Sequence, residues 1–195
     1  MLEGDFYGSE RLLHESLRMA DPTDLALVGR IWTALGFMGM VEPQRSLADR
    51  REPIQKAIAI GHELGDRLMV ASNLITLAGV EFATADFDAA RDHVQEAAEM
   101  SAEAESPILF AAVFYPLAII ANHDRRHRRT ARLLGAMQMM NDHAGGSAPQ
   151  VANALFGEPE PDARAALGEE EFDRAWAEGY ASTLDEAVAF ALDRG

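Results

Sequence analysis

The chain has 195 residues, of which 48% are hydrophobic and 25% charged, a composition typical of a globular protein with a sizeable core. It contains no cysteine, which excludes disulfides, thiolate nucleophiles and cysteine-ligated metal sites. Acidic residues outnumber basic ones by 32 to 17, and the net charge of −15 disfavours direct contact with nucleic acid. The single lysine, Lys56, lies outside any glycine-rich loop, so no phosphate-binding loop and no cofactor are predicted.

The sequence carries no signal for export or membrane insertion. Its first residues are acidic, whereas a signal peptide begins with basic residues followed by an apolar run. The longest charge-free stretch, 107–122, is shorter than the ~20 residues that cross a bilayer, and it contains Pro116. We therefore predict a cytoplasmic protein that does not contact membranes.

Apolar residues recur at helical spacing along almost the whole chain, which predicts an all-α fold. In chain order, the pattern predicts a leading helix at 8–20 and three helical hairpins at 23–64, 67–104 and 107–143. Four short helices follow, at 150–156, 162–167, 169–178 and 183–193. Helix starts are predicted at Asp21-Pro22, Ser46, Ser106-Pro107, Asp162 and Ser182, and helix ends at Gly65 and Gly145-Gly146.

An internal repeat links the hairpins. Residues 51–60 align with 91–100 at an offset of 40, and the turn 4–6 aligns with 85–87 at about twice that offset. Repeats of this length that contain two helices are typical of a helical solenoid. The chain begins at the second helix of a hairpin, so we expect a fragment of a larger protein.

One hairpin resembles the tetratricopeptide signature, in which small residues let paired helices approach and an aromatic residue follows the turn. Its matching positions are Leu77, Ala78, Ala85, Asp86, Phe87, Ala90, Val94 and Ala97. We therefore predict an α-solenoid of tetratricopeptide-like helical hairpins over residues 1–143. Residues 144–195 are predicted to form a C-terminal helical cap, packed on the repeats as part of a single structural domain.

Two motifs resemble the C-terminal region of large actinobacterial transcriptional regulators, including LuxR-type regulators and adenylate cyclases. The first is the segment 130–136, and the second is the tail formed by 166–179 and 184–192. In those families an ATPase module and a cyclase or winged-helix module precede a tetratricopeptide-like region, and some members end in a helix-turn-helix. The resemblance implies a regulatory module and supplies no catalytic residue.

No constellation for catalysis or metal binding is predicted. His123 and His127 are spaced to share a helix face, but arginines surround them and no carboxylate-rich partner accompanies them. The sequence offers neither a paired acid and base nor a Gly-x-Ser-x-Gly motif, so a helical hydrolase is disfavoured and no enzyme is predicted. Trp176, four residues after Phe172, is expected to pack in the core of the cap.

Two candidate binding surfaces remain. The first helices of the hairpins are almost free of charge, so we expect their common wall to be covered by the C-terminal helices, a second copy or a ligand. The aromatic residues proposed for this groove are Trp32, Phe110, Phe114 and Tyr115. The second surface is a basic patch that would dock an acidic partner, unless it pairs with acidic stretches 158–162 and 169–171. Its residues are Arg125, Arg126, Arg128 and Arg129.

Together these observations predict a non-enzymatic protein-interaction or sensing module of a larger signalling or transcriptional regulator. Its expected partners are other modules of the same regulator or a second copy of the chain. The alternative is an effector-binding domain that holds a small apolar ligand in the aromatic groove. Neither a metal nor a cofactor is expected in either case.

Overall fold

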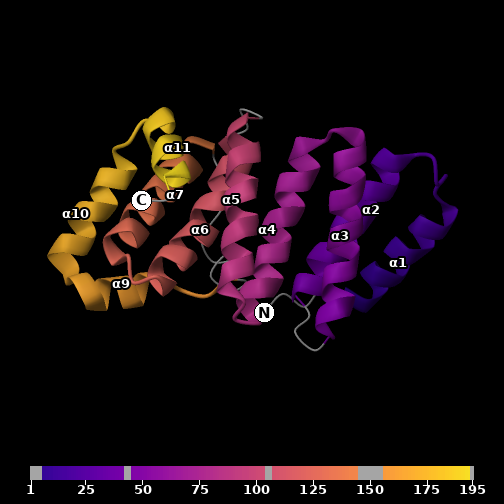
Figure 1. The fold of residues 1–195 in the computed structure, drawn as a ribbon, viewed down its shortest axis with the longest axis horizontal. Helices are drawn as coiled ribbons and strands as arrows, with labels where there is room; N and C mark the ends of the chain where they lie inside the picture. The colour runs from indigo at the N-terminus through magenta and orange to yellow at the C-terminus, as the bar shows by residue number, and fades with distance from the viewer. Residues whose placement is uncertain (1–5, 42–44, 104–106, 145–155, 194–195) are drawn as a thin grey trace.

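A computed structural model describes residues 6–41, 45–103, 107–144 and 156–193, and these ranges contain ten α-helices and no strand. The all-α prediction is therefore confirmed. Figure 1 shows the helices standing side by side in chain order, from α1 at one end to α10 at the other.

The helices agree with the predicted ones to within a few residues, apart from the expected helix 150–156, most of which lies outside the described residues. The leading helix and the three hairpins comprise α1 (Phe6–Met19), α2 (Leu25–Val41), α3 (Leu47–Leu64), α4 (Arg67–Ala83), α5 (Phe87–Glu103), α6 (Pro107–His123) and α7 (His127–Ala144). The C-terminal segment contains α9 (Glu160–Leu167), α10 (Glu169–Tyr180) and α11 (Leu184–Leu192).

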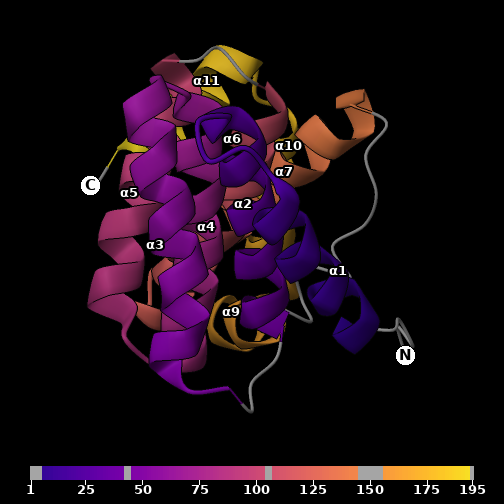
Figure 2. The same cartoon turned by 90° about the vertical axis from the view of Figure 1, so that its right-hand side faces the viewer.

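Each helix from α2 to α7 packs against the next one in the chain, and α2–α4 and α4–α6 also touch directly. Viewed from the α1 end, α3 and α5 lie together on one side of α2 and α4 (Figure 2). At the other end, α10 packs along α7, α9 contacts α7 and α10, and α11 reaches α5, α6 and α7. The C-terminal helices thus cover the last hairpin rather than the whole array.

Three of the turns between helices have the same backbone conformation. Gly65, Ala85 and Arg125 all lie in the left-handed region, with φ of 64°, 58° and 60°. In each turn this residue's N–H bonds to the carbonyl three residues back, and the next N–H bonds to the carbonyl five residues back. This is the Schellman arrangement that ends many helices. The spacing of 20 and 40 residues agrees with the sequence offset of 40, and the predicted helix end at Gly65 is confirmed.

The predicted helix starts are correct in part. Ser46 caps α3 by accepting the N–H of Asp49, as expected. The start at Asp21-Pro22 was wrong: Asp21 bonds to Thr23 within the turn, and Asp24 accepts the N–H of Leu27 instead. The other starts are displaced, since Thr183 rather than Ser182 caps α11 and α9 begins at Glu160 rather than Asp162. Ser106 and the Gly145-Gly146 pair lie outside the described residues.

A buried carboxylate joins the first two hairpins. Glu81 of α4 is only 2% exposed, and its oxygens lie 2.8 Å from Nδ1 of His93 and 3.5 Å from Nη2 of Arg51. The hydrogen bond to Glu81, reinforced by the charges of Glu81, Glu96 and Asp92, raises the pKa of His93 although burial opposes the shift. The charged form of His93 therefore stabilises the contact between α4 and α5.

This contact makes the stability of the fold depend on pH. Because the pKa of His93 is higher in the folded chain than the value of about 6.5 in an unfolded one, its contribution is complete below about pH 6.5. The contribution is lost as the pH rises through the folded value. We expect the difference in unfolding free energy between wild type and His93→Gln to be largest near pH 6 and to shrink in alkaline solution, as urea titrations would measure. His62→Gln, on the exposed side of α3, is the control. A difference in unfolding free energy between wild type and His93→Gln that does not change with pH would contradict the expectation.

Candidate functional site

The two sequence motifs that resemble regulators pack against each other where α7 meets α10. Gly135 of the first motif faces the backbone of Trp176, and Gly179 of the second faces the backbone of Arg132. A Cβ atom at either glycine would overlap the carbonyl oxygen of the residue opposite. The absence of side chains at both positions therefore allows the two helices to cross in backbone contact.

The basic patch begins in the third of the left-handed turns. Here arginine stands at the position where the other two turns have a helix-capping aspartate. Asp66 caps α4 by accepting the N–H of Met69 at 2.9 Å, and Asp86 accepts the N–H of Ala89 at 3.4 Å. The equivalent residue before α7 is Arg126, whose guanidinium cannot accept a hydrogen bond and lies at the positive end of the helix dipole. Positions where a sequence departs from its own local rule are typical of functional sites.

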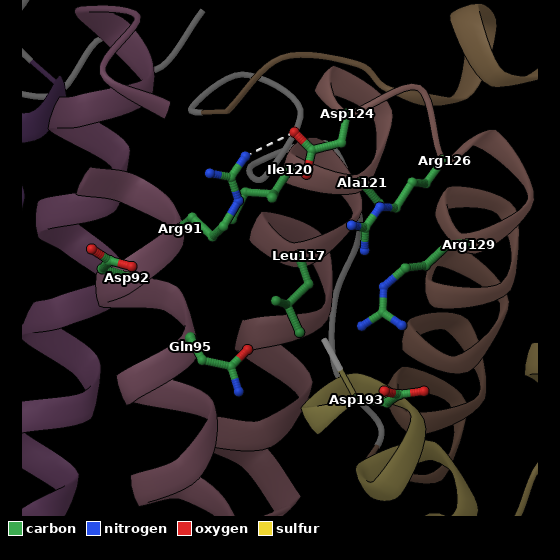
Figure 3. A pocket seen from close by; sticks show the side chains of 10 residues that line it. All are labelled: Arg91, Asp92, Gln95, Leu117, Ile120, Ala121, Asp124, Arg126, Arg129 and Asp193. Carbon is green, nitrogen blue, oxygen red and sulfur yellow. Dashed lines mark hydrogen bonds and ion pairs between the residues drawn. The ribbon is translucent and has the colours of Figure 1, made fainter. Parts of the chain in front are cut away.

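Beside this turn, three arginines line a cavity of about 110 Å³ between α5, α6 and α7 (Figure 3). Arg126 and Arg129 extend from α7 and its preceding turn toward the space, and Arg91 enters from α5 on the opposite side. Leu117, Ile120 and Ala121 of α6 line its apolar side, and Asp193 lies near the end of α11. We call this space the arginine cavity; its volume is enough for an acidic side chain.

The electrostatics of the arginine cavity are partly balanced from within. Nη2 of Arg91 lies 2.8 Å from Oδ1 of Asp124, the pair joined by the dashed line in Figure 3. Burial lowers the pKa of Arg129, and the charges of Arg126 and Arg132 lower it further, while Asp193 opposes the shift. Asp92, Asp124 and Asp193 also line the cavity, so an incoming acidic side chain would have to lie against Arg126 and Arg129 on the α7 side.

The four arginines of the predicted patch divide into two pairs. Arg128 contacts the C-terminal helix α10, with Nε 3.1 Å from Glu171 and Nη2 2.6 Å from Glu178. Arg129 donates to the carbonyl of Ala191 at 3.2 Å. The expected pairing with the acidic stretch 169–171 is thus confirmed for Arg128. These two arginines hold the C-terminal helices in place, whereas the side chains of Arg125 and Arg126 are exposed.

The four aromatic residues predicted to line one groove are not brought together. Phe110 and Phe114 are 2% and 0% exposed and pack against each other in the core, so they present no surface to a ligand. Trp32 is at the other end of the array, where Nζ of Lys56 lies 4.2 Å from its ring centre. Tyr115 lines a cavity on the face of α6 turned toward α9 and α10. Phe110 and Phe114 therefore belong to the core rather than to a surface groove.

The charge-poor helices are covered unevenly. Phe156, from the segment before α9, packs on Phe82 of α4 and Tyr115 of α6. Leu27 and Phe37 of α2 stay 43% and 46% exposed. Phe156 therefore covers part of α4 and α6, whereas Leu27 and Phe37 of α2 are exposed.

Within the ranges that the structure describes, no group of three or more His, Asp or Glu side chains could hold a metal ion. The ring of His123 instead stacks on Phe87 at 3.8 Å, and Nδ1 of His127 lies 3.1 Å from Asn122. None of the described helices is both long and apolar enough to cross a bilayer.

Comparison with known proteins finds similarity to transcriptional regulators. The chain is 37% identical over 75 residues to predicted HTH-type transcriptional regulators of Mycobacterium bovis and Mycobacterium tuberculosis. The matched segment covers 38% of this chain but only 8% of each regulator, so the chain spans a small part of their length. No family model and no solved structure matches. The similarity supports a transcriptional-regulator context for this all-helical chain.

Proposed function

We propose that the chain is a non-enzymatic protein-interaction module of a transcriptional regulator, built as a tetratricopeptide-like solenoid. The array of similar helical hairpins and the repeated turn support the solenoid, because each hairpin contacts mainly its neighbours. The similarity to HTH-type regulators supports the context. DNA contact is assigned to other parts of such a regulator, because the net charge of this chain is −15.

The observation that carries the proposal is the turn at Arg125 and Arg126. Its backbone has the same conformation as the turns at Gly65 and Ala85. However, the residue in the left-handed conformation is Arg125, which has a long side chain, and the residue at the capping position is Arg126. Both replacements lower the stability of the turn. We infer that they are retained for docking an acidic surface of another module of the regulator or of a second copy, with an acidic side chain entering the arginine cavity.

The proposal is tested by giving this turn the residues of the turn at Gly65. We expect the double variant Arg125→Gly/Arg126→Asp to be more stable than wild type by about 1–2 kcal/mol, because a glycine suits the left-handed position and an aspartate caps α7. The same variant should lose binding to the partner. Urea unfolding measures the first effect. A bacterial two-hybrid assay of the chain against itself and against successive segments of the Mycobacterium tuberculosis regulator measures the second.

A matched control separates the role of this turn from that of net charge. Arg11→Ala/Arg18→Asp, on exposed positions of α1, changes the charge by the same amount at the other end of the array. It should leave binding unchanged. Association that survives the turn variant, or no association with any segment, would contradict the proposal. Arg128 and Arg129 are left intact because they hold the C-terminal helices.

A further inference from the structure

A second cavity, of about 360 Å³, lies on the face of α6 and α7 that is turned toward α9 and α10. Its walls come from Tyr115 of α6, Leu134 and Met137 of α7, the segment 158–161 and Trp176 of α10. Pockets for small molecules commonly measure about 300–1,000 Å³ and are mostly apolar with a few polar groups. The space therefore has the size and lining of a ligand site, which we call the Trp176 cavity.

One wall of the Trp176 cavity is apolar and held rigid. Leu134 and Met137 are 5% and 6% exposed, so their positions are fixed by the core. The indole of Trp176 stacks on the ring of Tyr180 at 5.1 Å and an angle of 11°, and Tyr180 donates its hydroxyl to Asp142 at 2.9 Å. The indole, expected from the sequence to pack in the core, packs against the core while partly buried and also lines the cavity.

The polar side of the Trp176 cavity carries negative charge. Arg164 is its one basic lining residue, and carboxylates of Glu160, Glu169 and Asp173 already neutralise it at 2.5–2.8 Å. Glu158 makes no hydrogen bond or ion pair with any part of the chain that the structure describes. The lining of the cavity therefore includes an exposed carboxylate as well as an indole.

Tyr115 is affected by the same negative charge of the cavity. Its hydroxyl donates to the carbonyl of Gly157 at 2.6 Å, and burial, together with the charges of Glu158 and Glu160, raises its pKa to about 12. The phenol stays protonated, so the hydrogen bond that closes this side of the cavity persists at neutral pH. An anionic ligand would be repelled by the charges of Glu158 and Glu160, whereas a cation would be attracted by them.

We propose that the Trp176 cavity binds a small apolar cation, an amine with an aromatic or aliphatic body. The body would lie against Trp176, Met137 and Leu134, where it loses contact with water. The ammonium group would lie near Glu158 and over the face of the indole, since cations bind favourably to carboxylates and to the face of tryptophan. The residues that line this cavity differ from those that line the arginine cavity, and the proposal does not depend on docking at Arg125 and Arg126.

Isothermal titration of the full chain with three probes of one shape tests the proposal. Benzhydrylamine carries a positive charge, diphenylmethanol is neutral and diphenylacetate carries a negative charge. We expect saturable binding of the amine at one site, weaker binding of the alcohol, and binding of the acid at least about tenfold weaker than that of the amine. In a Trp32→Phe variant, where Trp176 is the single tryptophan, quenching or shifting of the fluorescence should saturate at the same amine concentration.

Two substitutions locate the site. Glu158 is exposed, so its replacement should not disturb the fold. Glu158→Gln should lower the affinity for the amine about three- to tenfold and leave the affinity for the alcohol unchanged. Glu63→Gln, an exposed glutamate of α3, is the control and should change neither. The proposal is overturned if the amine does not bind, if amine and acid bind equally, or if Glu158→Gln leaves amine affinity unchanged.

Discussion

Gly179→Ala is expected to force α10 away from α7 and to lower the free energy of unfolding by roughly 2–3 kcal/mol. The added methyl group would overlap the carbonyl oxygen of Arg132, and a backbone atom cannot rotate away as a flexible side chain can. The loss exceeds the gain of about 1 kcal/mol that alanine brings to a helix interior. Thermal unfolding followed by circular dichroism should show a fall in Tm of roughly 4–12 °C for a chain of this size.

The matched control is the same change at Gly39 of α2, where the added methyl would meet its nearest neighbour at 3.4 Å, an ordinary contact distance. Gly39→Ala should leave Tm unchanged or raise it slightly. Gly135→Ala should resemble Gly179→Ala, and the double variant should lose less than the sum, because the first methyl already separates the helices. A stable Gly179→Ala variant would show that the helices do not rely on this contact, and additive losses would show that the two glycines act independently.

Phe172→Ala is expected to have the largest effect of any single truncation in the C-terminal helices, roughly 3–5 kcal/mol. Phe172 is 0% exposed on α10, and the guanidinium of Arg164 lies 4.0 Å from its ring centre. Removing the ring leaves a cavity beneath α9 and α10 that the surrounding helices cannot close completely. Urea unfolding would measure the loss.

Phe37→Ala provides the comparison, since the same ring is 46% exposed on α2 and should contribute far less. Trp176→Ala should fall between the two, because its indole stacks on Tyr180 but also borders the Trp176 cavity. Equal losses for Phe172→Ala and Phe37→Ala would mean that burial does not govern the stability of α10.

Local sequence signals predicted the helices well because they act over a few residues. Ser46 and Gly65 identified the two ends of α3, and apolar spacing located the hairpins. The start of α2 was misplaced because Asp21 and Asp24 are both competent capping residues, and only the path of the chain decides between them. Such short-range competition cannot be resolved from residue types alone.

The candidate sites were harder to predict because they depend on which helices meet. A helix as apolar as α6 carries no polar face, so its sequence could not show that Phe110 and Phe114 point into the core while Tyr115 borders a cavity. The contact of Gly135 with α10 joins segments distant in the sequence. The basic patch was predicted from the sequence, but its place in a repeated turn needed an alignment of 65–66, 85–86 and 125–126, which puts Arg126 where the other turns have aspartate.

The regular spacing of the left-handed turns restricts how the length of this chain can change. A helix turns by about 100° per residue, so one residue inserted within α5 would rotate everything after it by that angle. Val94 and Ala97, both 0% exposed, would then turn toward water, and charged neighbours would enter the core. Insertions and deletions during evolution are therefore compatible with this architecture between helices, or as whole hairpins of about 40 residues, and not within a helix.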